Sequence, residues 1–83
     1  MSKILLTKRA EKDLQALPTP IAKRISAAIE DLATFGIQSS NIKKLKTPFP
    51  GYRKRIGDYR LLFEVNEEVI LIYRISKRSE AYK

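Results

Sequence analysis

Arginine and tyrosine are the side chains best suited to chemistry in this sequence, because the chain contains neither histidine nor cysteine. These two absences exclude Ser-His-Asp and Cys-His nucleophile pairs and the usual zinc sites. They also exclude a disulfide framework. Any catalysis must therefore use carboxylate, lysine, tyrosine or arginine side chains, and we expect no metal and no other cofactor.

The positive charge of the chain is concentrated in residues 37–63. The full chain has a formal charge of +8, and this third of it holds seven Lys and Arg residues against one acidic residue, Asp58. Such an excess indicates a polyanionic partner, with nucleic acid first and an anionic membrane or an acidic protein next. The alternative is a basic face that is merely solvated. The seven basic residues are Lys43, Lys44, Lys46, Arg53, Lys54, Arg55 and Arg60.

A β-hairpin is predicted around Gly57 and Asp58. The periodicity changes to two from residue 52, and the two residues between segments 52–56 and 59–65 have glycine first. A glycine at the first loop position is typical of a type II′ turn. A two-residue loop fixes the register of the two strands.

This register places three arginines, Arg53, Arg55 and Arg60, on one face of the sheet. Arg55 pairs with Arg60 and Arg53 pairs with Leu62, and alternate residues of a strand share a face. Arginines directly opposite each other are unfavourable by about a few tenths of a kcal/mol. A bound phosphate would explain the arrangement, because guanidinium groups bind phosphate bidentately and stabilise charge on phosphoryl oxygens. The alternative is that these long side chains extend into water at an exposed edge.

Tyr82 is the candidate general base at the C-terminal end. Neighbouring guanidinium and ammonium groups favour a phenolate, so they would lower the pKa of this tyrosine and make proton abstraction possible. One alternative is that Tyr82 covers the edge of the core or frays. Another is that Glu80 acts as the base, unless it only pairs with Arg78.

Two amphipathic helices are predicted before the basic segment, after a short strand at residues 4–6. Thr7 is a suitable N-cap for the first helix, and Pro18 ends it. Thr19 is a suitable N-cap for the second, and Gly36 ends it. The apolar faces consist of Ala10, Leu14 and Leu17 in the first helix and Ile21, Ile25, Ile29 and Leu32 in the second.

The order of elements predicts an α+β domain. A second turn is predicted at Asn66 and Glu67, and the apolar run 69–75 predicts a buried central strand. The order β-α-α-β-β-β then gives a helix hairpin packed on a small antiparallel sheet with an added N-terminal strand. The length of 83 residues predicts a single domain, 1–83. The longest apolar run, 69–73, is too short for a signal peptide or a membrane span, so we expect a cytoplasmic protein.

The segment 51–64, with its Gly-Asp-Tyr-Arg run at 57–60, resembles the core of the RelE/ParE superfamily of bacterial toxins. Leu45 and Lys46 before it, Ala10 and Leu14 in the first helix, and the ending from Arg78 to Tyr82 are also similar to that superfamily. The resemblance implies a toxin of a type II toxin–antitoxin pair, held inactive in a hetero-oligomer by a cognate antitoxin. For RelE-like members it further implies metal-independent cleavage of mRNA in the A site of the 70S ribosome, through attack of the 2′-hydroxyl on the adjacent phosphorus.

The resemblance also assigns roles to individual residues. The family's basic strand residues correspond to Arg53 and Arg55, its central arginine to Arg60, and its C-terminal arginine and tyrosine to Arg78 and Tyr82. Lys77 stands where many relatives have histidine. Lys54 and Lys77 are the candidates for protonating the leaving group. Contacts with RNA or the ribosome, including rRNA, are expected from Lys43, Lys44, Lys46, Lys54 and Lys77.

Two other functions stay open from the sequence. A ParE-like toxin poisons DNA gyrase by protein binding and needs no catalytic tyrosine, whereas the presence of Arg78 and Tyr82 favours a nuclease. A third possibility is an inert toxin that only binds its antitoxin.

Overall fold

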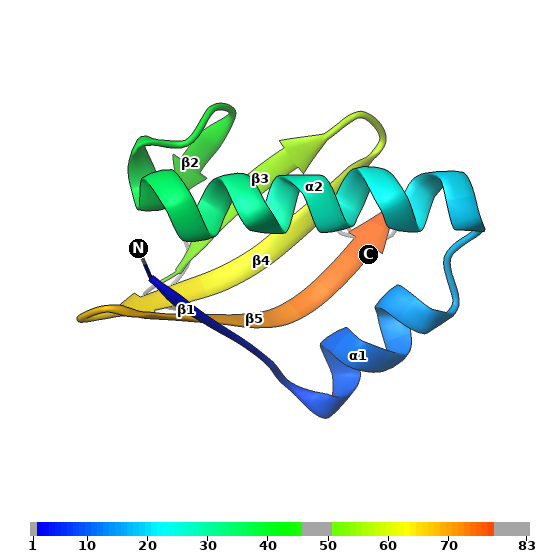
Figure 1. Ribbon diagram of the computed structural model, residues 1–83, viewed down its shortest axis with the longest axis horizontal. Helices are drawn as coiled ribbons and strands as arrows, with labels where there is room; N and C mark the ends of the chain where they lie inside the picture. Colours follow the sequence, from blue (N-terminus) through cyan, green and yellow to red (C-terminus); the bar gives the residue numbers. More distant parts are fainter. Residues whose placement is uncertain (1, 46–50, 78–83) are drawn as a thin grey trace.

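The computed structural model describes residues 2–45 and 51–77, which form a five-stranded sheet and two α-helices (Figure 1). In chain order the elements are β1 (Lys3–Leu6), α1 (Lys8–Gln15), α2 (Thr19–Phe35), the 3-10 helix η1 (Gly36–Gln38), β2 (Ile42–Lys44), β3 (Tyr52–Ile56), β4 (Tyr59–Asn66) and β5 (Val69–Lys77).

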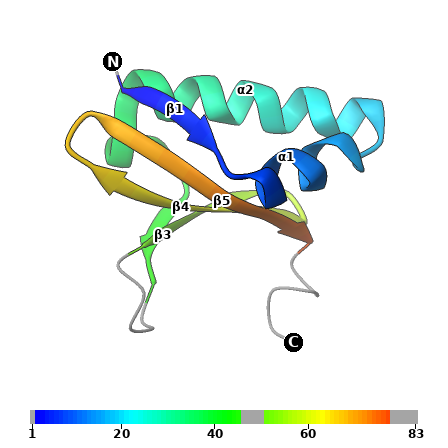
Figure 2. The ribbon, with the colours of Figure 1, turned by 90° about the horizontal axis from the view of Figure 1, so that it is seen from below.

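The sheet has the strand order β1-β5-β4-β3-β2. β1 pairs with β5 in parallel, and the other three pairings are antiparallel. Both α-helices lie on the same face of the sheet (Figure 2). The opposite face, which neither helix covers, is called the open face below. The predicted helix layer on a mainly antiparallel sheet is therefore confirmed.

Local sequence signals explain where the helices begin and end. The Thr7 side chain caps α1 by accepting a hydrogen bond from the backbone N–H of Ala10 at 3.1 Å. The N-cap of α2 is Pro18 rather than the predicted Thr19, which is already helical. Gly36 ends α2 with a φ of 59°, a left-handed conformation that glycine adopts without steric cost.

The core lies between the helix layer and the sheet. From the helices, Ala10, Ile25 and Leu32 are fully buried. They pack against buried residues at alternating positions of the sheet, as expected for a sheet with one covered face. The sheet contributes Leu61, Phe63, Ile70, Ile72 and Ile75.

Three details of the sheet differ from prediction. The short edge strand β2 was not predicted, because three residues are too few to show a period. The second turn consists of Glu67 and Glu68, since Asn66 still pairs with Val69. β5 has buried side chains mainly on its helix-covered face, and the centre of the strand order is β4. Within the described ranges, no helix is both long and apolar enough to cross a membrane.

Candidate functional site

The hairpin of β3 and β4 has the predicted register. Arg55 pairs with Arg60, and Arg53 pairs with Leu62. Gly57 at the first turn position has a φ of 58°, and Asp58 at the second position does not have a positive φ. This combination is the one that a type II′ turn requires. Arg53, Arg55 and Arg60 therefore share the open face of the sheet, and the prediction that these three residues converge is confirmed.

The three arginines differ in their exposure. Arg60, on the inner strand β4, is only 7% exposed. Arg53 is half-buried, and Arg55 is exposed and donates a hydrogen bond from Nε to the Gly57 carbonyl at 3.3 Å. Arg60 is therefore the least solvent-accessible of the three arginines.

A fourth arginine, Arg74, shares this face and was not identified from the sequence. Arg74 of β5 pairs with Leu62, which itself pairs with Arg53 across β3 and β4. Arg74 therefore belongs to the open face. We call Arg53, Arg55, Arg60 and Arg74 together the arginine face. The sequence feature that could have identified Arg74 is its position as the one charged residue within the otherwise apolar segment 69–75.

The predicted RNA-contacting lysines are divided between the two faces. Lys43 pairs with Arg53 and so lies beside the arginine face, and it is exposed. Lys44 pairs with Tyr52, and Lys77 pairs with Tyr59; both tyrosines pack against the core on the helix-covered side. Lys44 and Lys77 are exposed but lie on that side of the sheet.

Lys54 lies on the helix-covered face and is 3% exposed. Its ammonium group donates to the Ser39 hydroxyl at 2.5 Å and to the Ser40 carbonyl at 2.8 Å. Burial lowers the pKa of Lys54, and the charge of Asp31 partly opposes this shift. Alternation along β3 turns Lys54 away from Arg53 and Arg55, and its 3% exposure does not favour the expected RNA contact.

Lys46, Arg78 and Tyr82 lie outside the described residues, so their predicted roles remain predictions. Among the described tyrosines, Tyr52 stacks on Phe63 with ring centroids 5.7 Å apart, and Tyr59 packs against the core. Cross-strand packing is therefore the role of these two rings. The described part of the chain contains no group of three or more acidic side chains that could hold a metal ion.

The open face changes character toward the opposite end of the sheet. An open pocket there, of about 430 Å³, has apolar walls from Leu5, Val69 and Leu71 and acidic side chains from Glu64 and Glu67. The cations of the arginine face are thus separated from the apolar and acidic end. Among the described residues, positive potential on this face is therefore concentrated at the end formed by β3, β4 and the last part of β5.

Comparison with known proteins agrees with this geometry. Residues 4–82 match the family model described as the ParE toxin of the type II toxin–antitoxin system parDE. Toxin RelE3 of Methanocaldococcus jannaschii is 38% identical over 88 residues, which cover 96% of this chain and 94% of that protein.

Solved structures show the same fold. The RelB-RelE antitoxin–toxin complex from Methanococcus jannaschii contains a chain with a TM-score of 0.78 and 35% identity, covering 94% of both chains. The archaeal RelE-RelB complex from Pyrococcus horikoshii OT3 gives a TM-score of 0.75 and 28% identity, covering 93% of this chain and 94% of that one. The predicted RelE-like fold is thereby confirmed. The chain belongs to the RelE/ParE superfamily and is a RelE-family toxin of a type II toxin–antitoxin system.

Proposed function

We propose that this toxin is a ribosome-dependent endoribonuclease that cleaves mRNA in the A site without a metal. The observation that supports this most strongly is the convergence of Arg53, Arg55 and Arg60 on the sheet face that neither α1 nor α2 covers. A guanidinium group stays charged at any physiological pH and binds phosphate oxygens through a planar fork. Three such groups on one face suit a reaction in which negative charge develops on a phosphoryl group.

The proposed reaction is an internal phosphoryl transfer. The 2′-oxygen of the mRNA attacks the adjacent phosphorus, the bond to the 5′-oxygen of the next nucleotide breaks, and the products carry a 2′,3′-cyclic phosphate and a 5′-hydroxyl. Tyr82 as phenolate takes the proton of the 2′-hydroxyl. The arginines, together with Arg78, stabilise the charge on the equatorial oxygens. Because Lys54 and Lys77 both belong to the helix-covered side of the sheet, neither lies beside the arginines, and the proton for the 5′-oxygen comes from solvent.

The proposed partners follow from charge and from the relatives. The M. jannaschii and P. horikoshii RelE structures are complexes with RelB antitoxins. We infer a cognate antitoxin for this chain, forming a hetero-oligomer in the cytoplasm that keeps the toxin inactive. With a net charge of +8, the free toxin is attracted to ribosomal and messenger RNA.

A gyrase poison is the second candidate, because the matching family model is described as a ParE toxin. Such a toxin acts by binding a protein, so its activity does not require arginines and a tyrosine arranged around a phosphate. The two functions therefore differ in their dependence on Tyr82.

The discriminating experiment combines two assays on one preparation. Purified translating ribosomes are incubated with the wild type and with Tyr82→Phe, with free mRNA as a control, and DNA supercoiling by gyrase is measured in parallel. The proposal predicts A-site cleavage that needs the ribosome and is largely lost in Tyr82→Phe. Intact mRNA with inhibited supercoiling would assign the gyrase function instead. If neither mRNA cleavage nor inhibition of supercoiling is detected, the protein is assigned as an inert toxin that only binds its antitoxin.

A further inference from the structure

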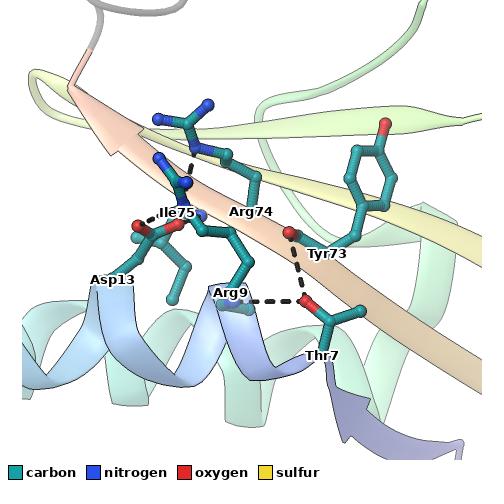
Figure 3. A network of polar contacts seen from close by, with 7 residues as sticks. Thr7, Arg9, Asp13, Tyr73, Arg74 and Ile75 are labelled. Carbon is teal, nitrogen blue, oxygen red and sulfur yellow. Dashed lines mark hydrogen bonds and ion pairs between the residues drawn. The ribbon is translucent and has the colours of Figure 1, made fainter.

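A β-bulge in β5 determines the side of the sheet to which Arg74 belongs. Leu62 of β4 pairs with Arg74, but its neighbour Phe63 pairs with Ile72, so Tyr73 is an extra residue in β5. Without this irregularity, simple alternation from the buried Ile72 would put Arg74 on the helix-covered face. Bulges often re-aim side chains next to functional sites. Figure 3 shows both Tyr73 and Arg74 extending from β5 on the side away from α1.

The N-terminal part of the chain holds this bulge from the outer edge of β5. The backbone N–H of Thr7 donates to the Ile72 carbonyl at 3.0 Å, and the Thr7 hydroxyl donates to the Tyr73 carbonyl at 3.2 Å. Oδ2 of Asp13 accepts a hydrogen bond from the backbone N–H of Ile75 at 3.0 Å. Carbonyl and N–H groups on both sides of Arg74 are thus fixed by residues of α1 and its N-cap.

Asp13 also contacts the Arg74 side chain directly. Nε of Arg74 lies 3.6 Å from Oδ2 of Asp13, while Oδ1 of Asp13 pairs with Nε of Arg9 at 3.4 Å (Figure 3). The Asp13 side chain is 15% exposed and that of Arg74 is 39% exposed. Nε of Arg74 is buried, and Figure 3 shows the two terminal nitrogens of the guanidinium group lying farther from Asp13 than Nε does.

We propose that Arg74 binds a phosphate of the RNA substrate and that Asp13 is the residue that positions it. This inference rests on the proposed function and adds Arg74 to the three arginines of the open face that were identified from the sequence. Arg60 and Arg74 lie on the same face of neighbouring strands, since Arg60 pairs with Ser76 and Leu62 pairs with Arg74. A diagonal separation of about 7–8 Å between such positions suits neighbouring phosphates of one strand better than a single phosphate.

The competing explanation is that Arg74 only neutralises Asp13. Arg9 already supplies a positive charge to the same carboxylate, on its other oxygen. Arg9 is 63% exposed and belongs to the helix layer, whereas Arg74 belongs to the arginine face. Both arginines pair with Asp13, but Arg9 lies on α1 and Arg74 lies on the arginine face, so Arg9 is a matched control for Arg74.

The test measures binding of the toxin to 70S ribosomes that carry an mRNA with 2′-deoxyribose at the cleavage position. This substrate cannot undergo attack by the 2′-hydroxyl, so binding is measured without cleavage. The dissociation constant is determined over a range of salt concentrations for the wild type, Arg74→Gln, Arg9→Gln and Asp13→Asn. Thermal unfolding of each variant establishes that it is folded at the assay temperature.

The proposal predicts that Arg74→Gln binds roughly tenfold more weakly than the wild type, because a charged hydrogen bond to phosphate is lost. It also predicts that the slope of log affinity against log salt becomes shallower by about 0.7. Arg9→Gln keeps both values. Asp13→Asn weakens binding but keeps the slope, because Arg74 retains its charge and loses only the carboxylate that positions it.

Equal behaviour of Arg74→Gln and Arg9→Gln would overturn the proposal, and so would a wild type that does not bind these ribosomes. The failure of the proposed nuclease function gives a different result. In that case an all-ribose mRNA stays intact on the ribosome, while the difference between Arg74→Gln and Arg9→Gln in binding persists.

Discussion

Arg55 and Arg60 lie directly opposite each other on adjacent antiparallel strands, in a hairpin whose two-residue turn leaves no freedom to shift the pairing. Like charges in directly opposed positions destabilise a sheet. Arg60 is also nearly buried, at 7% exposure. An arrangement of like charges that costs stability on the face opposite α1 and α2 is expected where function needs concentrated positive charge.

Replacing Arg55 by threonine should stabilise the protein. The substitution Arg55→Thr removes the repulsion with Arg60 and introduces a residue favoured in strands, so the free energy of unfolding should rise by about 0.2–1 kcal/mol. Urea denaturation at low salt measures this. The gain should shrink at high salt, where exposed charges are screened. A loss of stability would show that Arg55 contributes more through its hydrogen bond to Gly57 than it costs.

The turn between β4 and β5 should be stabilised by glycine at one of its two positions. Glu67 has a φ of 57°, whereas Glu68 does not have a positive φ. Glu67→Gly should therefore relieve about 1 kcal/mol of backbone strain. Glu68→Gly removes the same charge but should destabilise by about 0.5–1 kcal/mol, because glycine only adds entropy to the unfolded chain there. Equal shifts of the denaturation midpoint in both variants would contradict this.

The buried ammonium of Lys54 should make stability depend on pH. Burial lowers its pKa below the ordinary value of 10.5, so the unfolded chain binds more protons than the folded chain between the lowered pKa and 10.5. The free energy of unfolding should therefore rise with pH in that window. Lys54→Met should lack this rise when the two proteins are compared by urea denaturation from about pH 7 to about pH 10.

Tyr73 sets the highest pH at which the effect of Lys54 on stability can be measured alone. Burial, and then Glu64, raise the pKa of Tyr73 above 10.0, so the folded chain retains a proton that the unfolded chain has lost. This effect lowers stability as the pH rises above 10.0 and opposes that of Lys54. A parallel pH dependence of the wild type and Lys54→Met below this limit would argue against a lowered Lys54 pKa.

Gly51 lies closely packed against Tyr73 and Phe63. A Cβ atom at Gly51 would lie 3.0 Å from the Tyr73 hydroxyl oxygen and 3.2 Å from the Phe63 carbonyl oxygen. Gly51→Ala should therefore lower the free energy of unfolding by about 1–3 kcal/mol through overpacking. Combining it with Tyr73→Phe should recover part of the loss, since the carbonyl contact remains. An absence of coupling in this double-mutant cycle would show that the Tyr73 side chain moves aside without a cost in stability.

The hairpin and both helices could be predicted because short-range rules determine them. Gly57 and Asp58 specify a two-residue turn, and this turn alone determines that Arg60 pairs with Arg55. Thr7 and Gly36 mark helix ends through capping chemistry that is local in the sequence. The convergence of three arginines therefore followed from spacing alone.

The remaining parts of the site depend on contacts between distant residues. The bulge at Tyr73 reverses the alternation that the sequence suggests for Arg74, and it is held by Thr7 and Asp13, more than 60 positions away. The face of Lys54 followed from the predicted register, but its hydrogen-bond partners, the buried Ser39 and the exposed Ser40, come from a loop whose path no periodicity reveals.

The most direct test of the central claim is the single-turnover rate of mRNA cleavage on programmed ribosomes for Arg55→Gln and Arg24→Gln. Arg55 contacts the Gly57 turn from the arginine face, whereas Arg24 belongs to α2 and lies beside the same glycine. Losing one group that stabilises the transition state should lower the rate of Arg55→Gln by about a hundredfold or more. Arg24→Gln should keep the wild-type rate within about twofold. Equal rates for the two variants would contradict a catalytic arginine face.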